Sequence, residues 1–373
     1  MSKRSLPSAS PASPPAEAAA ESPAASPAPR TAAAGGLAEQ RRLQMADIAR
    51  LAGVSVSTVS RALSGSKLVN AETRQRVAEL ARSLNYSINL GAQNLRLQKN
   101  RTVAVVVPFE AASRQHISDP FFLALVGSIA DALTDQGYDM LLSRVDAEHL
   151  DLAAQFYDSG KAIGVIMVGQ WRHHDQLNAL AARQLPLVVW GGAMPQQLYC
   201  TVGGDNSDGG LQATRHLLQL GRRRIAFLGD AALPEVWLRR EGYQQALREA
   251  GLQAEPALEL ALPFEPGGAR TALERWLPQA PAFDAVVACS DLLALQAIHT
   301  LRAAGRRVPE DVAVVGYDDM PLAAYCDPPL STVHQPVAEA GAELVATLMA
   351  QLRGERSPSR TLGVSLIVRR SAA

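Results

Sequence analysis

Short apolar runs alternate with amphipathic stretches along the chain from residue 101 onward. Between the first two runs, residues 121–137 carry apolar side chains at helical spacing, and a helix there is expected to stop at Gly137. Runs that are almost entirely apolar are typical of parallel strands buried on both faces. Strand, helix and strand in repetition predict a doubly wound α/β fold. The units are too many for one ordinary sheet, so we expect two Rossmann-like lobes. The seven runs are residues 102–108, 138–144, 162–169, 185–191, 223–230, 284–291 and 311–318.

The stretch before residue 101 has a different pattern, which predicts three short amphipathic helices. They span residues 45–52, 56–63 and 71–85. Gly53 suits the turn between the first two, because glycine adopts positive φ without penalty. Ser55 and Asn70 are placed to cap the second and third helices. Three such helices close a core of about 50 residues, which is only marginally stable alone. The inward faces are expected to hold Met45, Ile48, Ala49, Ala52, Val59, Ala62, Leu63, Val77, Leu80, Ala81 and Leu84.

The outward face of residues 56–63 carries small and polar side chains. Small hydroxyls and one arginine suit a helix that lies against base edges and phosphates. We therefore expect a helix-turn-helix whose second helix enters the major groove of DNA. The alternative is an ordinary pair of helices in a small bundle. The residues expected to contact DNA from this helix are Val56, Ser57, Thr58, Ser60 and Arg61.

The composition indicates a globular chain with an unusual N-terminal segment. Of the 373 residues, 47% are apolar, and no stretch reaches the roughly 18 uninterrupted apolar residues of a membrane span. In residues 1–40, 27 positions are Ala, Pro or Ser, so this segment is expected to be disordered. Lys3 and Arg4 are not followed by a continuous apolar segment, which argues against a secretory signal. The three cysteines, Cys200, Cys289 and Cys326, are too few and too scattered for a disulfide framework or a zinc site. We therefore expect a cytoplasmic location.

Charge is distributed unevenly, although the formal net charge is zero. Residues 41–101 contain eleven Lys and Arg against three acidic residues, a balance of +8. Residues 102–373 contain 22 basic and 30 acidic residues, a balance of −8. A compact basic unit joined to an acidic body is the electrostatic pattern of a nucleic-acid binder with a separate sensing domain.

Residues 47–63, DIARLAGVSVSTVSRAL, closely resemble the DNA-binding signature of the LacI/GalR family of bacterial transcriptional repressors. The resemblance continues through LNYSINLGAQNL (84–95) and covers roughly residues 43–371. It implies a helix-turn-helix DNA-binding domain over residues 43–97. It also implies a core over residues 101–373 that has the type I fold of periplasmic sugar-binding proteins, binds an effector and dimerises.

The resemblance further implies a hinge helix over residues 86–97 that forms only on operator DNA. Asn89, Ala92 and Leu95 are the DNA-binding residues expected there, with the leucine wedged into a minor-groove step. Gly91 and Asn94 lower helix propensity, which agrees with a helix that needs DNA to form. Ile88 stands where the family commonly has proline.

Chemically useful side chains follow several of the expected strands. In open α/β sheets, ligands bind at the carboxyl ends of the strands. After the first run, Asp119 can accept hydrogen bonds from sugar hydroxyls, and Phe121 offers an apolar face to a pyranose. The resemblance adds Arg239, which matches the family arginine that donates to sugar hydroxyls. Carboxylates with an arginine and aromatic rings suit a neutral polyol. The expected effector-binding set is Asp119, Phe121, Gln170, Trp190, Arg239, Ser290, Asp291 and Asp318.

Paired carboxylates also raise the possibility of an enzyme, such as a glycoside hydrolase. A nucleophile elbow, a P-loop and metal-ligand spacing are all missing from the sequence, so we expect no catalysis, metal or cofactor. The glycine pair in VGGDN (202–206) is expected to form a turn. His173 and His174 follow Trp171 and Arg172 in a polar stretch, which we interpret as a solvated loop.

These observations together predict a homodimeric transcriptional repressor of carbohydrate-utilisation genes. Its partners are expected to be pseudo-palindromic double-stranded operator DNA and a small sugar or sugar-phosphate effector, and no membrane. A dimer is favoured over a tetramer because no heptad-patterned tail follows LIVRRS (366–371). The alternatives are an activator of the same family and a solute-binding protein that serves a sugar transporter.

Overall fold

The structure, a computed structural model, describes residues 45–63, 66, 68–84, 100–110, 117–263 and 266–373. The chain divides into two compact units, residues 1–88 and 89–373, which are described separately. The N-terminal segment 1–40 and the expected hinge residues Ile88, Asn89, Ala92 and Leu95 lie outside the described residues. Among the helices that the structure describes, none has the length and apolar character needed to cross a membrane.

Three helices form the first unit, as the sequence predicts. They are α1 (Met45–Ala52), α2 (Val56–Leu63) and α3 (Ala71–Ser83). Gly53 has a φ of 64° in the turn between α1 and α2. The Thr58 amide donates to Ser55 Oγ over 3.1 Å, and the Thr73 amide donates to Asn70 Oδ1 over 2.7 Å, so both predicted caps are confirmed. The small core consists of Ile48, Ala49, Ala52, Val59, Ala62, Val69 and Val77.

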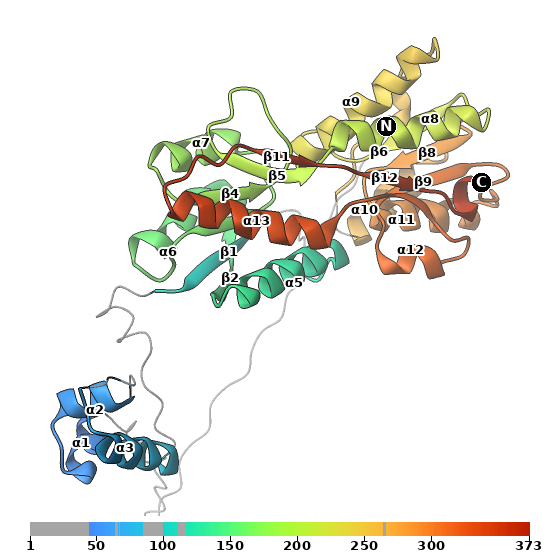
Figure 1. The fold of residues 1–373 in the computed structure, drawn as a ribbon. Coiled ribbons are helices and arrows are strands. Elements are labelled where there is room, and N and C mark those ends of the chain that lie inside the picture. The colour runs from blue at the N-terminus through green and yellow to red at the C-terminus, as the bar shows by residue number, and fades with distance from the viewer. Residues whose placement is uncertain (1–44, 64–65, 67, 85–99, 111–116, 264–265) are drawn as a thin grey trace, which may run out of the picture. The chain divides into compact units, whose positions relative to one another are not determined.

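The second unit contains two six-stranded sheets, one in each lobe (Figure 1). The sheet of the first lobe has the strand order β11-β5-β4-β3-β1-β2, and all of its strands are parallel. Its strands are β1 (Thr102–Phe109), β2 (Asp139–Asp146), β3 (Val165–Val168), β4 (Leu187–Trp190), β5 (Cys200–Gly204) and β11 (Arg360–Leu362). The helices of this lobe are α5 (Pro120–Asp135), η1 (Ala147–Ala153), α6 (Ala154–Asp158), α7 (His174–Ala182) and α13 (Val337–Leu352).

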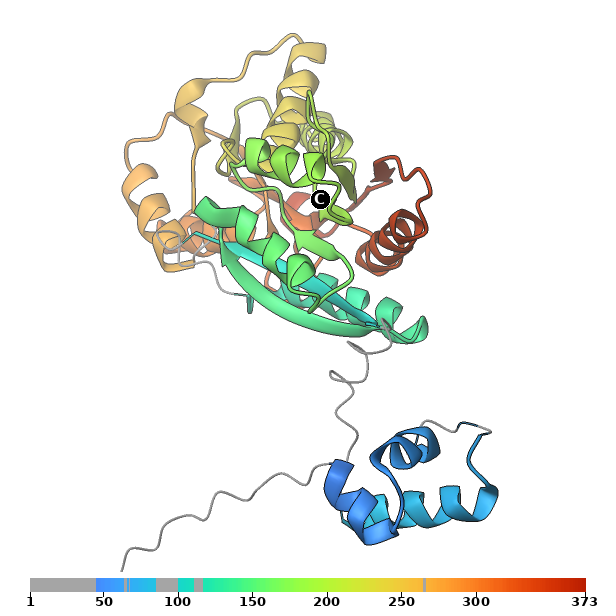
Figure 2. The ribbon, with the colours of Figure 1, turned by 90° about the vertical axis from the view of Figure 1, so that its left-hand side faces the viewer.

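Helices cover both faces of this sheet (Figure 2). Val103 and Val105 of β1 pack with α5 and α13 on one face. Ala104 and Val106 pack with η1, α6 and α7 on the other face. This alternation explains why the strands read as continuous apolar runs, because every second residue enters a different core.

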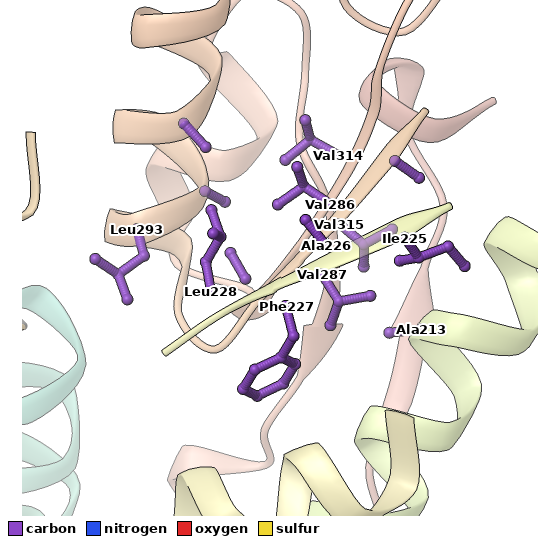
Figure 3. Close-up of a cluster of buried hydrophobic side chains, with 14 of the residues drawn as sticks. Ala213, Ile225, Ala226, Phe227, Leu228, Val286, Val287, Leu293, Val314 and Val315 are labelled. Carbon is purple, nitrogen blue, oxygen red and sulfur yellow. The ribbon is translucent and has the colours of Figure 1, made fainter. Parts of the chain in front are cut away.

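The sheet of the second lobe has the strand order β12-β10-β9-β8-β6-β7, and β12 alone runs antiparallel to its neighbour. Figure 3 shows Phe227 and Val287 on one side of this sheet, and Val286 and Val314 on the other. The strands are β6 (Ile225–Leu228), β7 (Glu259–Leu260), β8 (Ala285–Ala288), β9 (Ala313–Asp318), β10 (Ser331–His334) and β12 (Ser365–Ile367). The helices are α8 (Asn206–Gln219), α9 (Pro234–Glu249), η2 (Pro256–Leu258), α10 (Pro266–Trp276), α11 (Asp291–Ala303), α12 (Pro321–Tyr325) and η3 (Arg370–Ala372).

The chain passes between the lobes three times. It crosses after β5, between β10 and α13, and between β11 and β12 (Figure 1). The short connections consist of Asp205, of Gln335 and Pro336, and of Gly363 and Val364, respectively. Three short connections let the lobes turn about one edge of each sheet while keeping both lobes intact.

The glycine pair in residues 202–206 corrects one expectation. Gly203 and Gly204 do not form a turn but lie in the buried strand β5. A Cβ atom on Gly203 would lie 2.2 Å from the carbonyl oxygen of Gly191, so only glycine permits this approach of the two backbones. The pattern favoured a turn because glycine is common in turns and in closely approaching strands alike.

Candidate functional site

A cleft between the two lobes of the second unit has a volume of about 650 Å³, including the part that is open to solvent. The strands of both sheets end around it, as expected for an open α/β sheet. Six of the eight expected effector-binding residues line it: Asp119, Phe121, Trp190, Arg239, Ser290 and Asp318. The wall also contains Phe122, Gly169, Trp171, Leu233, Glu235 and Val236.

Aromatic side chains form the wall that the first lobe contributes. The rings of Phe121 and Trp190 lie 6.0 Å apart, and Phe121 packs edge-on against Phe122 at 5.9 Å. Trp171 is buried beside them, at a φ of 52°. Because the rings pack against one another, the wall is held in shape before a ligand arrives.

Asp119 is the carboxyl group on this aromatic wall. Its Oδ1 accepts from the Phe121 amide over 2.9 Å and caps helix α5. Burial raises the pKa of Asp119 above its usual value, and the bond from the Phe121 amide opposes that shift. Capping the helix is a sufficient structural role for Asp119 even when no ligand is bound. Its Oδ2 can accept a hydrogen bond from a hydroxyl group of a ligand.

Arg239 is the cation on the wall that the second lobe contributes. Its guanidinium lies over the ring of Tyr317, 3.7 Å from the ring centroid. Nε donates to Asn206 Oδ1 over 2.8 Å, and Nη1 donates to the carbonyl oxygen of Cys289. Only 7% of the residue is exposed, so these contacts orient a guanidinium that is already largely removed from water.

Asp318 ends strand β9 in a conformation that L-residues rarely adopt. Its φ is 118°, and Asp319 follows at 54°. Gln335, at the second crossing between the lobes, donates from Nε2 to Asp318 Oδ1 over 2.8 Å. Burial raises the pKa of the Asp318 carboxyl well above its usual value, although the positive charge of Arg239 opposes this. Backbone strain of this kind is typical of functional sites.

Ser290 and Glu235 complete the polar wall. Ser290 Oγ accepts from the Leu293 amide over 3.2 Å and so caps helix α11. Glu235 lies in the first turn of α9, and its Oε1 accepts from the Gln170 amide of the other lobe over 3.4 Å. Burial raises the pKa of Glu235 above its usual value.

The structure places Gln170 behind the cleft wall instead of on it, which corrects that expectation. Its side-chain nitrogen Nε2 donates to the Gly192 carbonyl over 2.8 Å and to Tyr199 Oη over 2.9 Å. Its Oε1 accepts from the Gly192 amide over 2.9 Å. With 0% of the residue exposed, the side chain holds the connection after β4 in place.

Asp291 also lies behind the wall. Its two carboxylate oxygens accept from Thr332 Oγ1 over 2.5 Å and from the Met320 amide over 2.8 Å. Burial raises the pKa of Asp291 to about 7. Its role is to tie α11 to the segment that follows β9, because its oxygens are already occupied.

The histidine pair corrects a further expectation. His174 does not lie in a solvated loop but begins helix α7, where its Nδ1 lies 2.8 Å from Tyr199 Oη. Both His173 and His174 are half-buried. Among the residues that the structure describes, no cluster of three or more His, Cys, Asp or Glu has the arrangement of a metal site.

Sequence reasoning missed Trp171, Glu235 and Phe122 on the cleft wall. Trp171 stands two residues beyond Gly169, and Glu235 stands six residues beyond Gly229, so a search of the segments after strands could have found both. Phe122 packs against the core beneath α5 as well as lining the cleft, so its apolar character alone did not indicate a place on the cleft wall.

The outward face of α2 in the first unit has the exposure that DNA contact requires. Val56, Ser57 and Arg61 are exposed, and Thr58 and Ser60 are partly exposed. Val59 and Ala62 turn inward into the helical core. The polar face is therefore separated cleanly from the packing face.

Comparison with known proteins matches models in both units. The model of bacterial regulatory proteins of the lacI family matches residues 44–89, and that of the periplasmic binding protein-like domain matches residues 214–372. The HTH-type transcriptional regulator CelR of Thermobifida fusca is 35% identical over 340 residues, which span 89% of this chain and 99% of that protein.

Solved structures agree with the sequence comparison. The complex of transcriptional regulator CelR with cellobiose is 33% identical, with a TM-score of 0.66 over 88% of this chain and 100% of that one. The lac repressor dimer bound to operator and the anti-inducer ONPF has a TM-score of 0.78 over 89% and 99% of the chains, and at 24% identity this likeness shows the fold alone. The predicted fold class and family are thereby confirmed. The chain belongs to the LacI family of bacterial transcriptional regulators.

Proposed function

We propose that this protein is a homodimeric repressor of carbohydrate-utilisation genes whose hold on operator DNA is relieved by a small uncharged sugar in the cleft. The observation that carries the proposal is the pairing of an aromatic wall with a polar wall across one cleft. Sugars present apolar C–H faces and a rim of hydroxyl groups, and they need both kinds of surface. We assign the cleft to binding, not to catalysis.

The charges on the described cleft wall favour an uncharged effector over a sugar phosphate. Asp119, Glu235 and Asp318 supply three carboxyl groups, and Arg239 supplies one guanidinium. Two Arg239 nitrogens already donate to Asn206 and to Cys289. A phosphate dianion would meet carboxylates, whereas a hydroxyl group can donate to a carboxylate and accept from a neutral carboxyl. The likeness to a regulator solved with cellobiose makes neutral disaccharides the first compounds to test.

DNA recognition is assigned to the outward face of α2 in each protomer. Two copies related by two-fold symmetry would read two half-sites of a pseudo-palindrome. The excess of basic residues between positions 41 and 101 favours phosphate contacts. Arg61 is expected to neutralise a phosphate, while Val56 and Ser57 are expected to meet base edges.

Selection of bound duplexes from a random library tests the DNA assignment. The full chain should enrich a two-fold symmetric site, and its affinity should fall steeply as salt rises. Arg61→Ala should weaken all sequences alike, and Ser57→Ala should change the preferred bases. Arg82→Ala, an exposed arginine at the end of α3, is the matched control. Unchanged affinity and base preference in both test variants would remove α2 from the interface.

Thermal stabilisation of the full chain across matched sugar pairs tests the effector assignment. Cellobiose and other neutral disaccharides should include a ligand that raises the melting temperature, while phosphorylated counterparts should not. Arg239→Lys should reduce the stabilisation at a given sugar concentration, because lysine cannot reproduce the donor geometry of the guanidinium. Stabilisation by phosphorylated sugars alone would overturn the assignment of an uncharged effector.

A further inference from the structure

One group of charged side chains bridges the two lobes outside the cleft wall. Arg172 of the first lobe donates from Nη2 to Asp230 of the second lobe. Its Nε also lies 3.3 Å from Glu110 Oε1, within the first lobe. Glu110, Arg172 and Asp230 follow strands β1, β3 and β6, so all three stand at the ends of the sheets that face the cleft.

Strand order places this bridge far from the connections about which the lobes turn. The three connections join the lobes at β5 and β11 in one sheet and at β10 and β12 in the other. β1 and β3 lie two or more strands away from β5, and β6 lies three strands away from β10. When two bodies rotate about one edge, atoms far from that edge separate most. The bridge therefore spans a part of the cleft that separates when the lobes turn apart.

The bridge is joined directly to the cleft wall on both sides. Arg172 follows Trp171, and Asp230 precedes Leu233 by three residues, and both neighbours line the cleft. The Gln170 amide also meets Glu235 Oε1 across the lobes over 3.4 Å. Opening of the lobes has to break both of these cross-lobe contacts.

The charge balance makes the bridge sensitive to loss of the arginine. The two acidic side chains are less exposed to solvent than the basic one. The Glu110 and Asp230 side chains are 20% and 23% exposed, and that of Arg172 is 43% exposed. Without the guanidinium, two acidic groups would face each other across the mouth of the cleft. An isolated ion pair on the surface contributes little to stability. In this network, however, replacing the arginine between the two acids converts attraction between the lobes into repulsion.

We propose that Arg172, Glu110 and Asp230 form an electrostatic clasp that holds the cleft closed before an effector enters. Opening of the lobes then has to break the clasp, and ionic strength sets how readily it breaks. The clasp belongs to the core alone, so it holds whether or not the effector is a sugar.

Quenching of tryptophan fluorescence by acrylamide tests the clasp in the full chain without any ligand. The chain has four tryptophans, of which Trp171 and Trp190 line the cleft. Replacing the other two, Trp237→Phe and Trp276→Phe, leaves emission from the cleft wall alone. In this background, Arg172→Glu should raise the ratio of open to closed protein by about twofold to fivefold. The quenching constant should rise with this ratio.

Salt should separate an electrostatic clasp from simple loosening of the segment around Trp171. Raising ionic strength from about 0.1 M to about 1 M shortens the Debye length from about 10 Å to about 3 Å. Quenching should then increase in the parent protein and decrease in Arg172→Glu, because salt screens attraction in one and repulsion in the other. Arg183→Glu, which breaks the Arg183–Asp158 pair within the first lobe, should change neither value.

Reversal of the charges supplies the decisive control. The double variant Arg172→Asp with Asp230→Arg should restore the quenching constant of the parent protein. Equal quenching in the parent and Arg172→Glu would overturn the clasp. So would failure of the reversed pair to restore closure, or a salt response of the same sign in both proteins.

Discussion

The two walls of the cleft differ in how far a ligand is needed to explain them. On the first lobe, Phe121, Phe122 and Trp190 pack against one another and into the core beneath. On the second lobe, the polar groups beside the cleft are Arg239 and Asp318, which are buried, and Glu235, which is half-buried. The aromatic wall is stabilised by its own packing, whereas the polar wall retains charged groups at a cost in desolvation.

This difference assigns the two walls different tasks. Packed rings accept any ligand with an apolar face, so the first lobe is expected to supply affinity with little stereochemical choice. Fixed donors and acceptors reject a ligand whose hydroxyl groups point elsewhere, because the buried partners are then left unpaired. Specificity is therefore expected to come from the second lobe.

Arg239→Ala should have the largest effect on this division. A hydrogen bond to a charged group contributes about 1.5–3 kcal/mol, so effector affinity should fall by about 10- to 150-fold. Operator binding should persist, because Arg239 belongs to the core and lies outside the helix-turn-helix. Calorimetry with the effector found in the sugar screen measures the loss, and the ratio of affinities for two epimers should collapse with it. Retention of that ratio would place specificity on other residues.

The second-largest expected effect is a pH dependence of stability that arises from the second lobe. The pKa of Asp291 is raised from 3.8 to about 7, so its protonated form stabilises the fold. That contribution is complete below about pH 4 and is lost as the pH rises through about 7. Melting temperatures of the parent and Asp291→Asn should therefore diverge by a few degrees across this window, with the parent falling faster. Trp190→Leu should follow the slope of the parent, and an identical slope in Asp291→Asn would refute the assignment.

Trp190→Leu should weaken effector binding less than Arg239→Ala. Loss of an aromatic contact costs about 0.5–1.5 kcal/mol, which is about a 2- to 13-fold loss of affinity. The loss should be equal for epimeric sugars, because a ring face does not distinguish hydroxyl orientation. Unequal losses for epimers would show that the aromatic wall also reads stereochemistry.

Ser290→Ala should have the smallest effect on effector affinity. Its hydroxyl caps α11, so the substitution should lower the stability of the core by about 1 kcal/mol. Effector affinity should change less than twofold once the protein is folded. A tenfold loss in calorimetry would show that the Ser290 hydroxyl also contacts the ligand.

The elements could be predicted from the sequence wherever the physical signal is local. Val103 to Val107 indicate a strand because both faces of β1 are buried, and Asn70 indicates a cap because its side chain reaches an amide three residues later. The carboxyl-end rule then brought Asp119 and Asp318 to one cleft, although 199 positions separate them in the chain.

The features that escaped prediction depend on distant partners. Gly203 lies in a strand because the backbone of Gly191 approaches it closely. Gln170 lies behind the wall because its side-chain amide binds Gly192 and Tyr199. No local pattern contains these partners. The crossings between the lobes escaped for the same reason, since β10, β11 and β12 are short and a single strand does not reveal its sheet.

The most direct test of the account is the linkage between the cleft and the operator. Operator affinity of the full chain is measured with and without the uncharged sugar, and sugar affinity is measured with and without operator. Linkage requires that each ligand weaken the other by the same factor, and Arg239→Lys should raise the sugar concentration needed to weaken operator binding. A sugar that binds the parent cleft tightly and leaves operator affinity unchanged would contradict the account.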